Sequence, residues 1–193
     1  MCKKFEDFEK EALQYKQILL DYRDKGKVFC DPNFHPESKI PESKVKIDSE
    51  IKWNRIDSIY PASLFNPDLI NPRFIQNGEN VNLSFISVLL HLSSQPYLIP
   101  YLFDHQAASI LGKVKNSINL KCGAVVVYFH AFGRKTPVLI DTRIPCGSDG
   151  TPLFTKLNDS TKSPWFILVE KAFAKLWESY SGIHSNNFTS SMY

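Results

Sequence analysis

The sequence predicts an α+β fold in which packed helices surround a small antiparallel β-sheet. Segments 82–93 and 164–180 carry apolar residues at helical spacing, and both are long enough to be core helices. Between them, segment 122–144 is rich in β-branched and aromatic residues and is divided by a turn at Gly133, which predicts a hairpin. With 193 residues, 43% of them hydrophobic, the chain suits one domain with a substantial core.

The composition argues against several classes of function. The chain has 23 basic and 20 acidic residues, which are interspersed, and this balance is not the footprint of nucleic-acid binding. No apolar run approaches the roughly 20 residues of a membrane span, and the N-terminus is too polar for a signal peptide. We therefore predict a cytoplasmic protein without nucleic-acid binding, membrane insertion, cofactor or small-molecule substrate.

The four cysteines show no C-x-x-C spacing, so we predict neither a metal site nor a disulfide framework. Free thiols in a reducing compartment are the expected state. No helix N-terminus or basic partner is evident near the last three, so activated thiols are not expected. The cysteines are Cys2, Cys30, Cys122 and Cys146.

Residues 1–26 are predicted to form an amphipathic helix that ends near Gly26. Its aromatic and aliphatic residues recur at spacings of three and four, which keeps them on one face. Two interpretations stay open, because this face could pack on the body of the chain or dock on another protein. The possible partner face comprises Phe5, Phe8, Tyr15, Leu19 and Tyr22.

Three further regions are expected after this helix. Residues 27–50, which are rich in Pro, Ser and Lys, should form an irregular connector. Residues 51–183 should form the folded domain. Trp53 should mark the point where the chain joins the core after the polar linker. Residues 61–80 should form a loop. The Ser- and Asn-rich tail, 184–193, should be mobile.

Segment 82–93 is predicted to be the central helix, with Asn82 as its N-cap. It is apolar nearly all round, so we expect burial on most sides. Pro96 should open a further short helix, whose inward-facing residues are predicted to be Tyr97, Leu98, Leu102 and Phe103.

The hairpin should comprise strands Cys122–Phe132 and Thr136–Ile144. A polar loop over 147–164 follows it, with Gly, Ser and Asp turn signals. The last helix then begins at Pro164, and helical periodicity gives it a core face. That face comprises Trp165, Leu168, Val169, Ala172 and Leu176.

Several segments resemble the calpain family of cysteine proteases, in the family's order. Residues 51–55, Ile-Lys-Trp-Asn-Arg, resemble its Ile-x-Trp-Lys-Arg signature. Residues 165–176 resemble its Trp-Ser-Ala-Leu-Leu-Glu-Lys-Ala-Tyr-Ala-Lys-Leu stretch, which is the most specific match. In the second hairpin strand, Asp141, Arg143 and Pro145 match its Val-Val-Val-Asp-Asp-Arg-Leu-Pro strand. The resemblance implies the first, cysteine-bearing subdomain of a papain-like protease core.

Residues 77–89 resemble the calpain active-site segment. In that segment a Gln-Gly pair lies shortly before Gly-Asp-Cys-Trp-Phe-Leu-Ser-Ala-Leu. The match places the nucleophilic cysteine on Leu83, the following tryptophan on Ser84 and the oxyanion-hole glutamine on Asn77. Leucine has no thiolate, and asparagine is one methylene shorter than glutamine. The family's catalytic His and Asn lie in a second subdomain, which we expect to be absent. The resemblance therefore implies a pseudoprotease rather than an enzyme.

Substitute chemistry is not expected. Ser84 and His91 are two helical turns apart, about 10.5 Å along the axis, which is too far for a nucleophile–base pair. Ser87 and His91 are four residues apart and could touch, but such pairs are usually surface contacts. Many calpains carry a calcium-binding acid where this chain has Phe74, so calcium is not expected there.

Three functions follow as hypotheses. The first is a structural or scaffold protein acting through protein–protein contacts, because some inactive calpain-like proteins of protists are associated with the cytoskeleton or flagella. By analogy alone, this suggests a cytoskeletal or axonemal, microtubule-associated setting. The alternative is a regulatory pseudoprotease that pairs with or inhibits an active calpain-like chain. A third, enzymatic role would need Ser84 or a free cysteine.

Two roles stay open for Leu83, which would lie where the substrate cleft of a protease is found. It stabilises packing if that cleft is closed, and it forms an apolar patch for a partner if the cleft is open.

Overall fold

The computed structural model describes residues 5–34, 51–60, 67–78, 83–103, 122–131, 133–159, 161–180 and 183. Its helices are α1 (Phe5–Asp24), α2 (Ile56–Ile59), α3 (Leu83–Ser93), α4 (Ile99–Phe103) and α5 (Trp165–Leu176), with short 3-10 turns η2 (Pro67–Leu69), η3 (Pro72–Phe74) and η4 (Pro96–Leu98). Its strands are β1 (Lys52–Arg55), β2 (Ile75–Gln76), β3 (Ala124–Ala131), β4 (Arg134–Asp141), β5 (Arg143–Cys146) and β6 (Lys156–Leu157). The predicted α+β class is confirmed.

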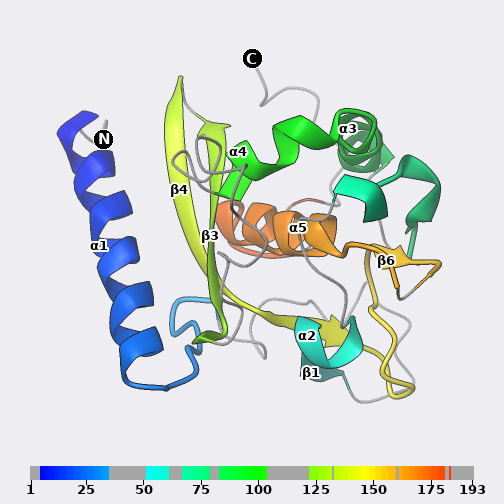
Figure 1. The fold of residues 1–193 in the computed structure, drawn as a ribbon, viewed down its shortest axis with the longest axis horizontal. Helices are drawn as coiled ribbons and strands as arrows, with labels where there is room; N and C mark the ends of the chain where they lie inside the picture. The colour runs from blue at the N-terminus through cyan, green and yellow to red at the C-terminus, as the bar shows by residue number, and fades with distance from the viewer. Residues whose placement is uncertain are drawn as a thin grey trace.

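The long hairpin β3–β4 is the centre of the fold (Figure 1), and its prediction is confirmed. The register runs from Ala124 opposite Asp141 to Ala131 opposite Arg134, and Gly133 supplies the positive φ of 73° that the tight turn requires. After Thr142 the chain leaves this pair and continues as β5, which pairs with β1. The short strands β2 and β6 form a third antiparallel pair.

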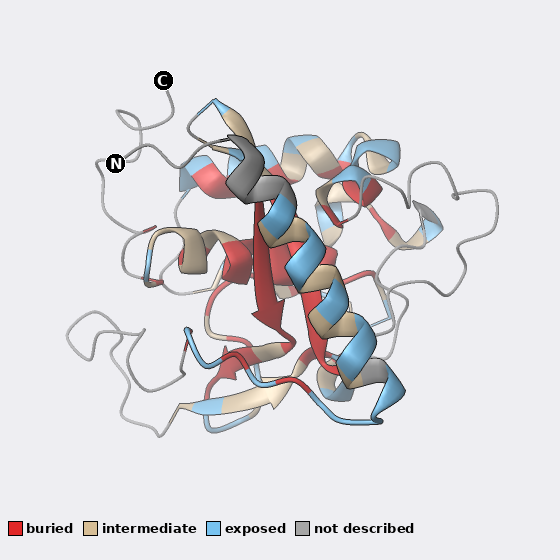
Figure 2. Ribbon diagram, turned by 90° about the vertical axis from the view of Figure 1, so that its left-hand side faces the viewer, coloured by how far each residue is buried: buried red, intermediate tan, exposed pale blue. Residues whose placement is uncertain are grey.

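Successive side chains of a strand point to opposite sides, so the hairpin has two faces. Both faces are buried. On one face, Val125, Val127 and Ile140 join the main core with residues of α3 and α5. On the other, Val126, Tyr128 and Leu139 form a second cluster under α1. Figure 2 looks onto this second face and shows α1 crossing in front of the buried strands.

Helix α1 therefore packs on the body of the chain. Tyr15, Leu19 and Tyr22 contact the second cluster, together with Ala12 and Ile18. These three residues are only partly buried against the hairpin, so their assignment to a partner face stays a prediction. The side chains of Phe5 and Phe8 lie outside the described residues. Likewise, most of the predicted connector and the predicted tail fall outside them.

The helix that is buried on most sides is α5. Nine of its residues are buried, including Trp165, Phe166 and Leu168. The prediction of such burial for α3 is wrong, because only its Phe85, Ile86, Leu89 and Ser93 side is buried. The opposite side of α3 faces outward. It carries the residue placed at the nucleophile position, Leu83.

The short helical segment after Pro96 is confirmed as η4 and α4. Phe103 is buried as predicted, but Tyr97 and Leu98 point outward, and so does Tyr101. The inward direction expected for Tyr97 and Leu98 is wrong because the buried side of this segment is formed instead by Ile99, Pro100 and Phe103.

Among the helices that the structure describes, none combines the length and the apolar character needed to span a membrane.

Candidate functional site

The site that the sequence singles out lies at the start of α3. Leu83 is the first residue of that helix, and 70% of its surface is exposed. Ser84 is also exposed. The Ser87 hydroxyl donates a hydrogen bond to the Leu83 carbonyl at 2.9 Å rather than to His91, which is exposed one turn further on. The start of α3 is therefore accessible to solvent, and its most exposed described side chain, that of Leu83, is a hydrocarbon.

Asn77 and Gly78 follow β2 and line the approach to α3. Asn77 is exposed, whereas Gly78 lies against the backbone of the loop before β6. A Cβ atom on Gly78 would lie within 2.3 Å of the Leu153 carbonyl oxygen and would overlap that of Phe154. Only glycine fits this close approach of two backbone segments. The Gly of the family's Gln-Gly pair is thus retained here for a packing reason.

Replacing Gly78 by alanine is expected to lower the free energy of unfolding by about 1–3 kcal/mol, because two backbone segments must separate. Urea denaturation measures the change. Gly147→Ala is the matched control, since its Cβ would first meet a flexible side-chain atom, Asp149 Oδ1, at 3.1 Å. Equal losses in both variants would contradict this account of Gly78.

Phe74 stands where many calpains carry a calcium-binding acid. It is half-buried at the end of η3, and the Lys162 ammonium lies 5.0 Å from the centre of its ring. An aromatic ring beside a cation offers no oxygen ligand. In the described ranges, no three His, Cys, Asp or Glu side chains are grouped so that they could hold a metal ion.

Cys30 has a basic neighbour, so the prediction that it lacks one is wrong. Arg55 Nη2 donates to Cys30 Sγ at 3.4 Å, and Cys30 is exposed. The contact was invisible in the sequence because 25 positions separate the two residues. Cys122 and Cys146 are buried, and burial raises the pKa of the Cys146 thiol.

Cys30 is expected to react with iodoacetamide in the folded protein while Cys122 and Cys146 stay protected. A Cys2→Ser background removes the fourth thiol from the measurement, and peptide mass spectrometry reads the labelled positions. Urea should expose all three remaining cysteines. Labelling of Cys146 as fast as that of Cys30 under native conditions would contradict the described burial.

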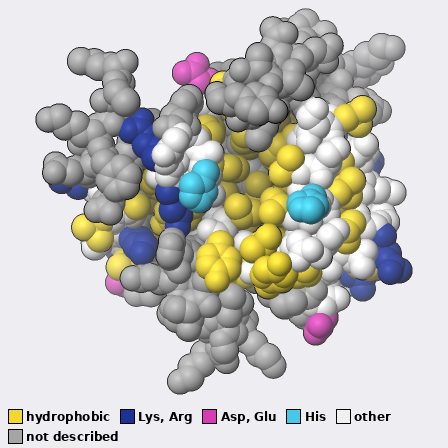
Figure 3. All heavy atoms as spheres, turned by 90° about the horizontal axis from the view of Figure 1, so that it is seen from above, with side chains coloured by type: hydrophobic (Ala, Val, Ile, Leu, Met, Phe, Trp, Pro, Cys, Tyr) yellow, Lys and Arg dark blue, Asp and Glu magenta, His cyan; other side chains and the backbone are white. Residues whose placement is uncertain are grey.

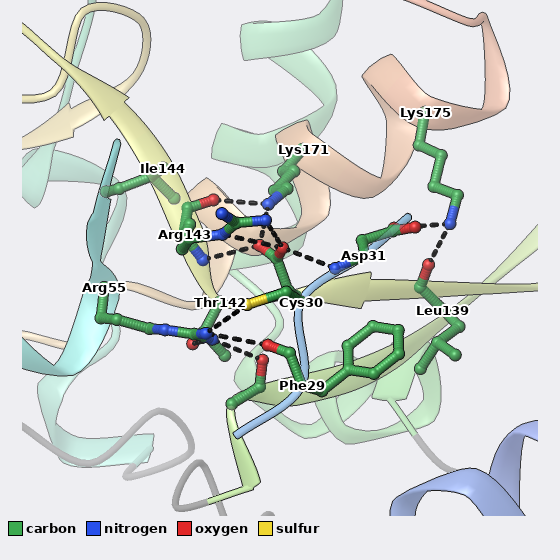
Figure 4. A network of polar contacts seen from close by, with 12 residues as sticks. Phe29, Cys30, Asp31, Arg55, Leu139, Thr142, Arg143, Ile144, Lys171 and Lys175 are labelled. Carbon is green, nitrogen blue, oxygen red and sulfur yellow. Dashed lines mark hydrogen bonds and ion pairs between the residues drawn. The ribbon is translucent and has the colours of Figure 1, made fainter. Parts of the chain in front are cut away.

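The densest polar cluster of the described structure surrounds Asp141, at the end of β4 (Figure 4). Lys171 Nζ, from α5, donates to Asp141 Oδ1 at 2.5 Å, and both side chains are almost fully buried. Arg143 Nη2 donates to Asp141 Oδ2 at 2.6 Å. The backbone N–H of Asp31 donates to the same oxygen at 2.9 Å. One carboxylate thus joins α5, two strands and the segment after α1.

The segment after α1 has two further anchors, also drawn in Figure 4. Lys175 Nζ donates to Asp31 Oδ2 at 2.6 Å and to the Leu139 carbonyl at 2.7 Å. Arg55 Nη2 donates to the Phe29 carbonyl at 2.8 Å, and its Nη1 donates to the Gly123 carbonyl at 2.9 Å. These contacts fix the residues that connect α1 to the domain.

The charges of this cluster oppose the cost of burial. Burial by itself would raise the pKa of Asp141, but the Lys171 charge and hydrogen bonds from Arg143 and Lys171 lower it to about 2. Burial lowers the pKa of Lys171 to about 8, against the attraction of Asp141. The lowered pKa of Asp141 favours a charged carboxylate, whereas the lowered pKa of Lys171 favours a neutral amine. The hydrogen-bond geometry favours the charged pair at neutral pH, because Asp141 accepts from groups of three residues, Lys171, Arg143 and Asp31.

Glu170 is a second buried charge-bearing group, next to Lys171 on α5 but on another side of the helix. Its Oε2 accepts hydrogen bonds from the Thr155 hydroxyl at 2.5 Å and the Thr155 N–H at 3.0 Å. Its Oε1 is buried without a hydrogen-bond partner. Burial raises the pKa of Glu170 to about 7, although the Thr155 hydrogen bonds act to lower it.

The residues of this buried cluster belong to the recognised motifs, but sequence reasoning gave them no role. Lys171 is 30 positions from its partner Asp141, and Lys175 is 144 positions from its partner Asp31. The signal available in the sequence was that charged residues lie inside apolar segments. Such residues are rarely buried without a partner, so the pattern indicates buried ion pairs.

Comparisons with known proteins agree with the motifs. The model of the calpain family cysteine protease domain matches residues 29–193, which includes all but the first two residues of the predicted connector. The chain is 30% identical over 174 residues to the calpain-type cysteine protease DEK1 of Arabidopsis thaliana, covering 81% of this chain and 7% of that protein. It is 27% identical over 184 residues to a calpain of Schistosoma mansoni, covering 93% of this chain and 23% of that one.

A third relative is calpain-5 of Caenorhabditis elegans, 27% identical over 165 residues, with 82% of this chain and 24% of that protein covered. The chain therefore spans less than a quarter of the length of each of these relatives. The match of the family model extends over most of the chain and includes α3, the hairpin and α5. The chain belongs to the calpain family of cysteine proteases.

Proposed function

We propose that this chain is a non-catalytic calpain-like protein that acts through protein–protein contacts as a structural or scaffold component. The proposal rests on Leu83, which the motif match places at the family's nucleophilic cysteine and which is 70% exposed. A hydrocarbon side chain cannot form an acyl-enzyme. An exposed one at the end of a helix suits contact with another protein.

Two further features support a loss of catalysis. Asn77, at the position of the oxyanion-hole glutamine, is exposed and shorter, and each lost oxyanion donor costs about 100- to 1000-fold in rate. Of the retained residues of the matched motifs, Lys171 pairs with Asp141, and both Asp141 and Lys175 bond to Asp31. Their contacts join α5 to β4 and to the segment after α1 and so stabilise the fold.

The setting proposed for this role is a cytoskeletal or axonemal assembly in the cytoplasm. It rests on analogy with inactive calpain-like proteins and on no contact in this structure. The proposal therefore predicts a location as well as an absence of activity, and the two are tested separately.

Detergent extraction of cells expressing the tagged chain, with cross-linking mass spectrometry of both fractions, tests the location. The expected result is retention in the insoluble cytoskeleton with links to filament proteins. Leu83→Glu should release the chain, whereas Leu13→Glu, at a leucine with 69% exposure on α1, should not. A soluble chain linked to a calpain-like protease would contradict the scaffold role and favour a regulatory pseudoprotease, which peptide-cleavage rates would then measure.

Covalent labelling by broad serine- and cysteine-directed activity probes tests the absence of catalysis. The expected result is no labelling at Ser84 and no rate of peptide hydrolysis above background. Labelling and hydrolysis that disappear together in Ser84→Ala or Cys30→Ala would overturn the non-catalytic assignment. Simple alkylation of exposed Cys30 without hydrolysis would leave the assignment intact, because a reactive thiol by itself is not a catalytic centre.

A further inference from the structure

Glu170 is a buried carboxyl group that no described cation neutralises. The acidic side chains visible from above the molecule lie near the margins of that view (Figure 3), whereas Glu170 is 2% exposed. Its neighbour on α5, Lys171, pairs with Asp141 instead. None of the ion pairs formed by the described residues includes Glu170. Such a place favours the neutral carboxyl group, because an isolated buried charge loses its solvation.

The two oxygens of Glu170 have different surroundings. Oε2 accepts hydrogen bonds from the Thr155 hydroxyl at 2.5 Å and from the Thr155 N–H at 3.0 Å. Oε1 is buried and has no hydrogen-bond partner in the described structure. Ionisation would place part of a full negative charge on that unpartnered oxygen. The closed arrangement is therefore suited to the protonated carboxyl group.

Thr155 lies in residues 153–157, here called the β6 segment, which contacts the chain ahead of α3. Within it, β6 pairs with β2, with Leu157 opposite Ile75. The Leu153 carbonyl lies so close to Gly78 that a Cβ atom there would be 2.3 Å from its oxygen. The Thr155–Glu170 contact thus joins α5 to the two backbone segments that meet at Gly78.

We propose that Glu170 and the β6 segment form a pH-sensitive latch, which is closed while the carboxyl group is protonated and opens locally as it ionises. Burial raises the pKa of Glu170 to about 7 in the closed state, although the Thr155 hydrogen bonds act to lower it. In an open state water solvates the carboxylate, so its pKa returns towards 4.5. The open state therefore releases the proton first, and opening becomes easier as the pH rises from 4.5 through 7.

The other titratable groups around Glu170 and Tyr180 leave this interval to the carboxyl group. Burial, together with the charge of Glu170, raises the pKa of the Tyr180 phenol, and burial raises the pKa of the Cys146 thiol on β5. Both groups therefore stay neutral. Burial lowers the pKa of Lys171 to about 8, so measurements that end at about pH 7 leave this ammonium mostly charged. Lys156, on the β6 segment itself, is partly exposed.

Hydrogen exchange of the whole chain, followed by peptide mass spectrometry from about pH 5 to pH 7 and corrected for the intrinsic rates, tests the latch. Protection of the β6 segment should fall at least about tenfold over this range. At about pH 7 it should also be at least about tenfold lower than the protection of β3, which exchanges through global unfolding. Equal protection of the β6 segment and β3 at every pH would overturn the latch, because only global unfolding would then expose Glu170.

Variants identify the titrating group. Glu170→Gln should remove the fall in protection of the β6 segment, and a fall that persists in this variant would overturn the proposal. Thr155→Val removes the hydroxyl donor to the carboxylate and should move the midpoint of the fall to higher pH. Thr155→Ser, which keeps a hydroxyl, is the matched control and should keep the wild-type midpoint. Equal midpoints in Thr155→Val and Thr155→Ser would overturn the latch even if Glu170→Gln did not fold.

Discussion

Replacing Asp141 by asparagine is expected to lower the free energy of unfolding by about 3–5 kcal/mol at pH 7. The substitution keeps the shape of the side chain but removes the charge that Lys171 and Arg143 share. Lys171 is 1% exposed, so its ammonium would remain in the interior beside a second cation with no carboxylate bonded to it. Urea denaturation followed by tryptophan fluorescence measures the loss.

Asp159→Asn is the matched control for this prediction. Asp159 forms an ion pair with Lys162 at 3.7 Å, but both side chains are partly exposed. Such surface pairs contribute about 0–1 kcal/mol, so the control should change stability by less than that. A loss of similar size in Asp141→Asn and Asp159→Asn would show that the buried cluster has no special role.

The double variant Asp141→Asn, Lys171→Met separates burial of an unpaired charge from loss of an attraction. Because methionine removes the stranded ammonium, the double variant should be more stable than Asp141→Asn alone by at least about 1 kcal/mol. A double variant that is less stable than the single one would mean that the loss comes from packing around Lys171, which lies 5.4 Å from the ring of Trp53.

Replacing Glu170 by glutamine is expected to remove a fall in stability with rising pH. The pKa of Glu170 in the folded chain is raised from 4.5 to about 7 by burial. The unfolded chain therefore releases its proton first, and the folded state loses stability as the pH rises from 4.5 through 7. A pKa difference of this size corresponds to about 3 kcal/mol, which the wild type should lose relative to Glu170→Gln across that interval.

The measurement is urea denaturation of both proteins at several pH values between 4.5 and 8. The difference between them isolates Glu170 from other titrating groups, since those are common to both chains. Glutamine keeps an oxygen that can accept from Thr155, so the contact at 2.5 Å is not the quantity removed. Glu178→Gln, at an exposed position after α5, is the matched control for loss of a carboxylate. Parallel pH profiles for wild type and Glu170→Gln would refute the proposed ionisation.

Together these two predictions give the family motifs a role in stability, whichever residue stands at the nucleophile position. Lys171 and Lys175 extend from α5 to carboxylates on β4 and on the segment after α1. Glu170 holds Thr155, next to the residue whose carbonyl lies against Gly78. These side chains join elements that would otherwise separate. Their role in stability does not depend on a thiolate at the start of α3.

Local sequence patterns determined the regular elements of this protein. Enrichment in β-branched and aromatic residues predicted β3 and β4, helical spacing predicted α1 and α5, and a run that is apolar nearly all round predicted α3. The motifs predicted the family and the place of Leu83 at the start of a helix. Each of these inferences needed only neighbouring residues or their order along the chain.

Only the tertiary structure decided what each apolar face meets. An amphipathic pattern shows that α1 has a face to bury, but it contains no information on whether the hairpin or a partner covers that face. The apolar composition of α3 suggested burial on most sides, yet no described element covers Leu83 and Val88. The pairing of Asp31 with Lys175 and with Asp141 joins residues more than a hundred positions apart. Such contacts depend on how the elements pack, because burial and charge pairing arise only when distant segments come together.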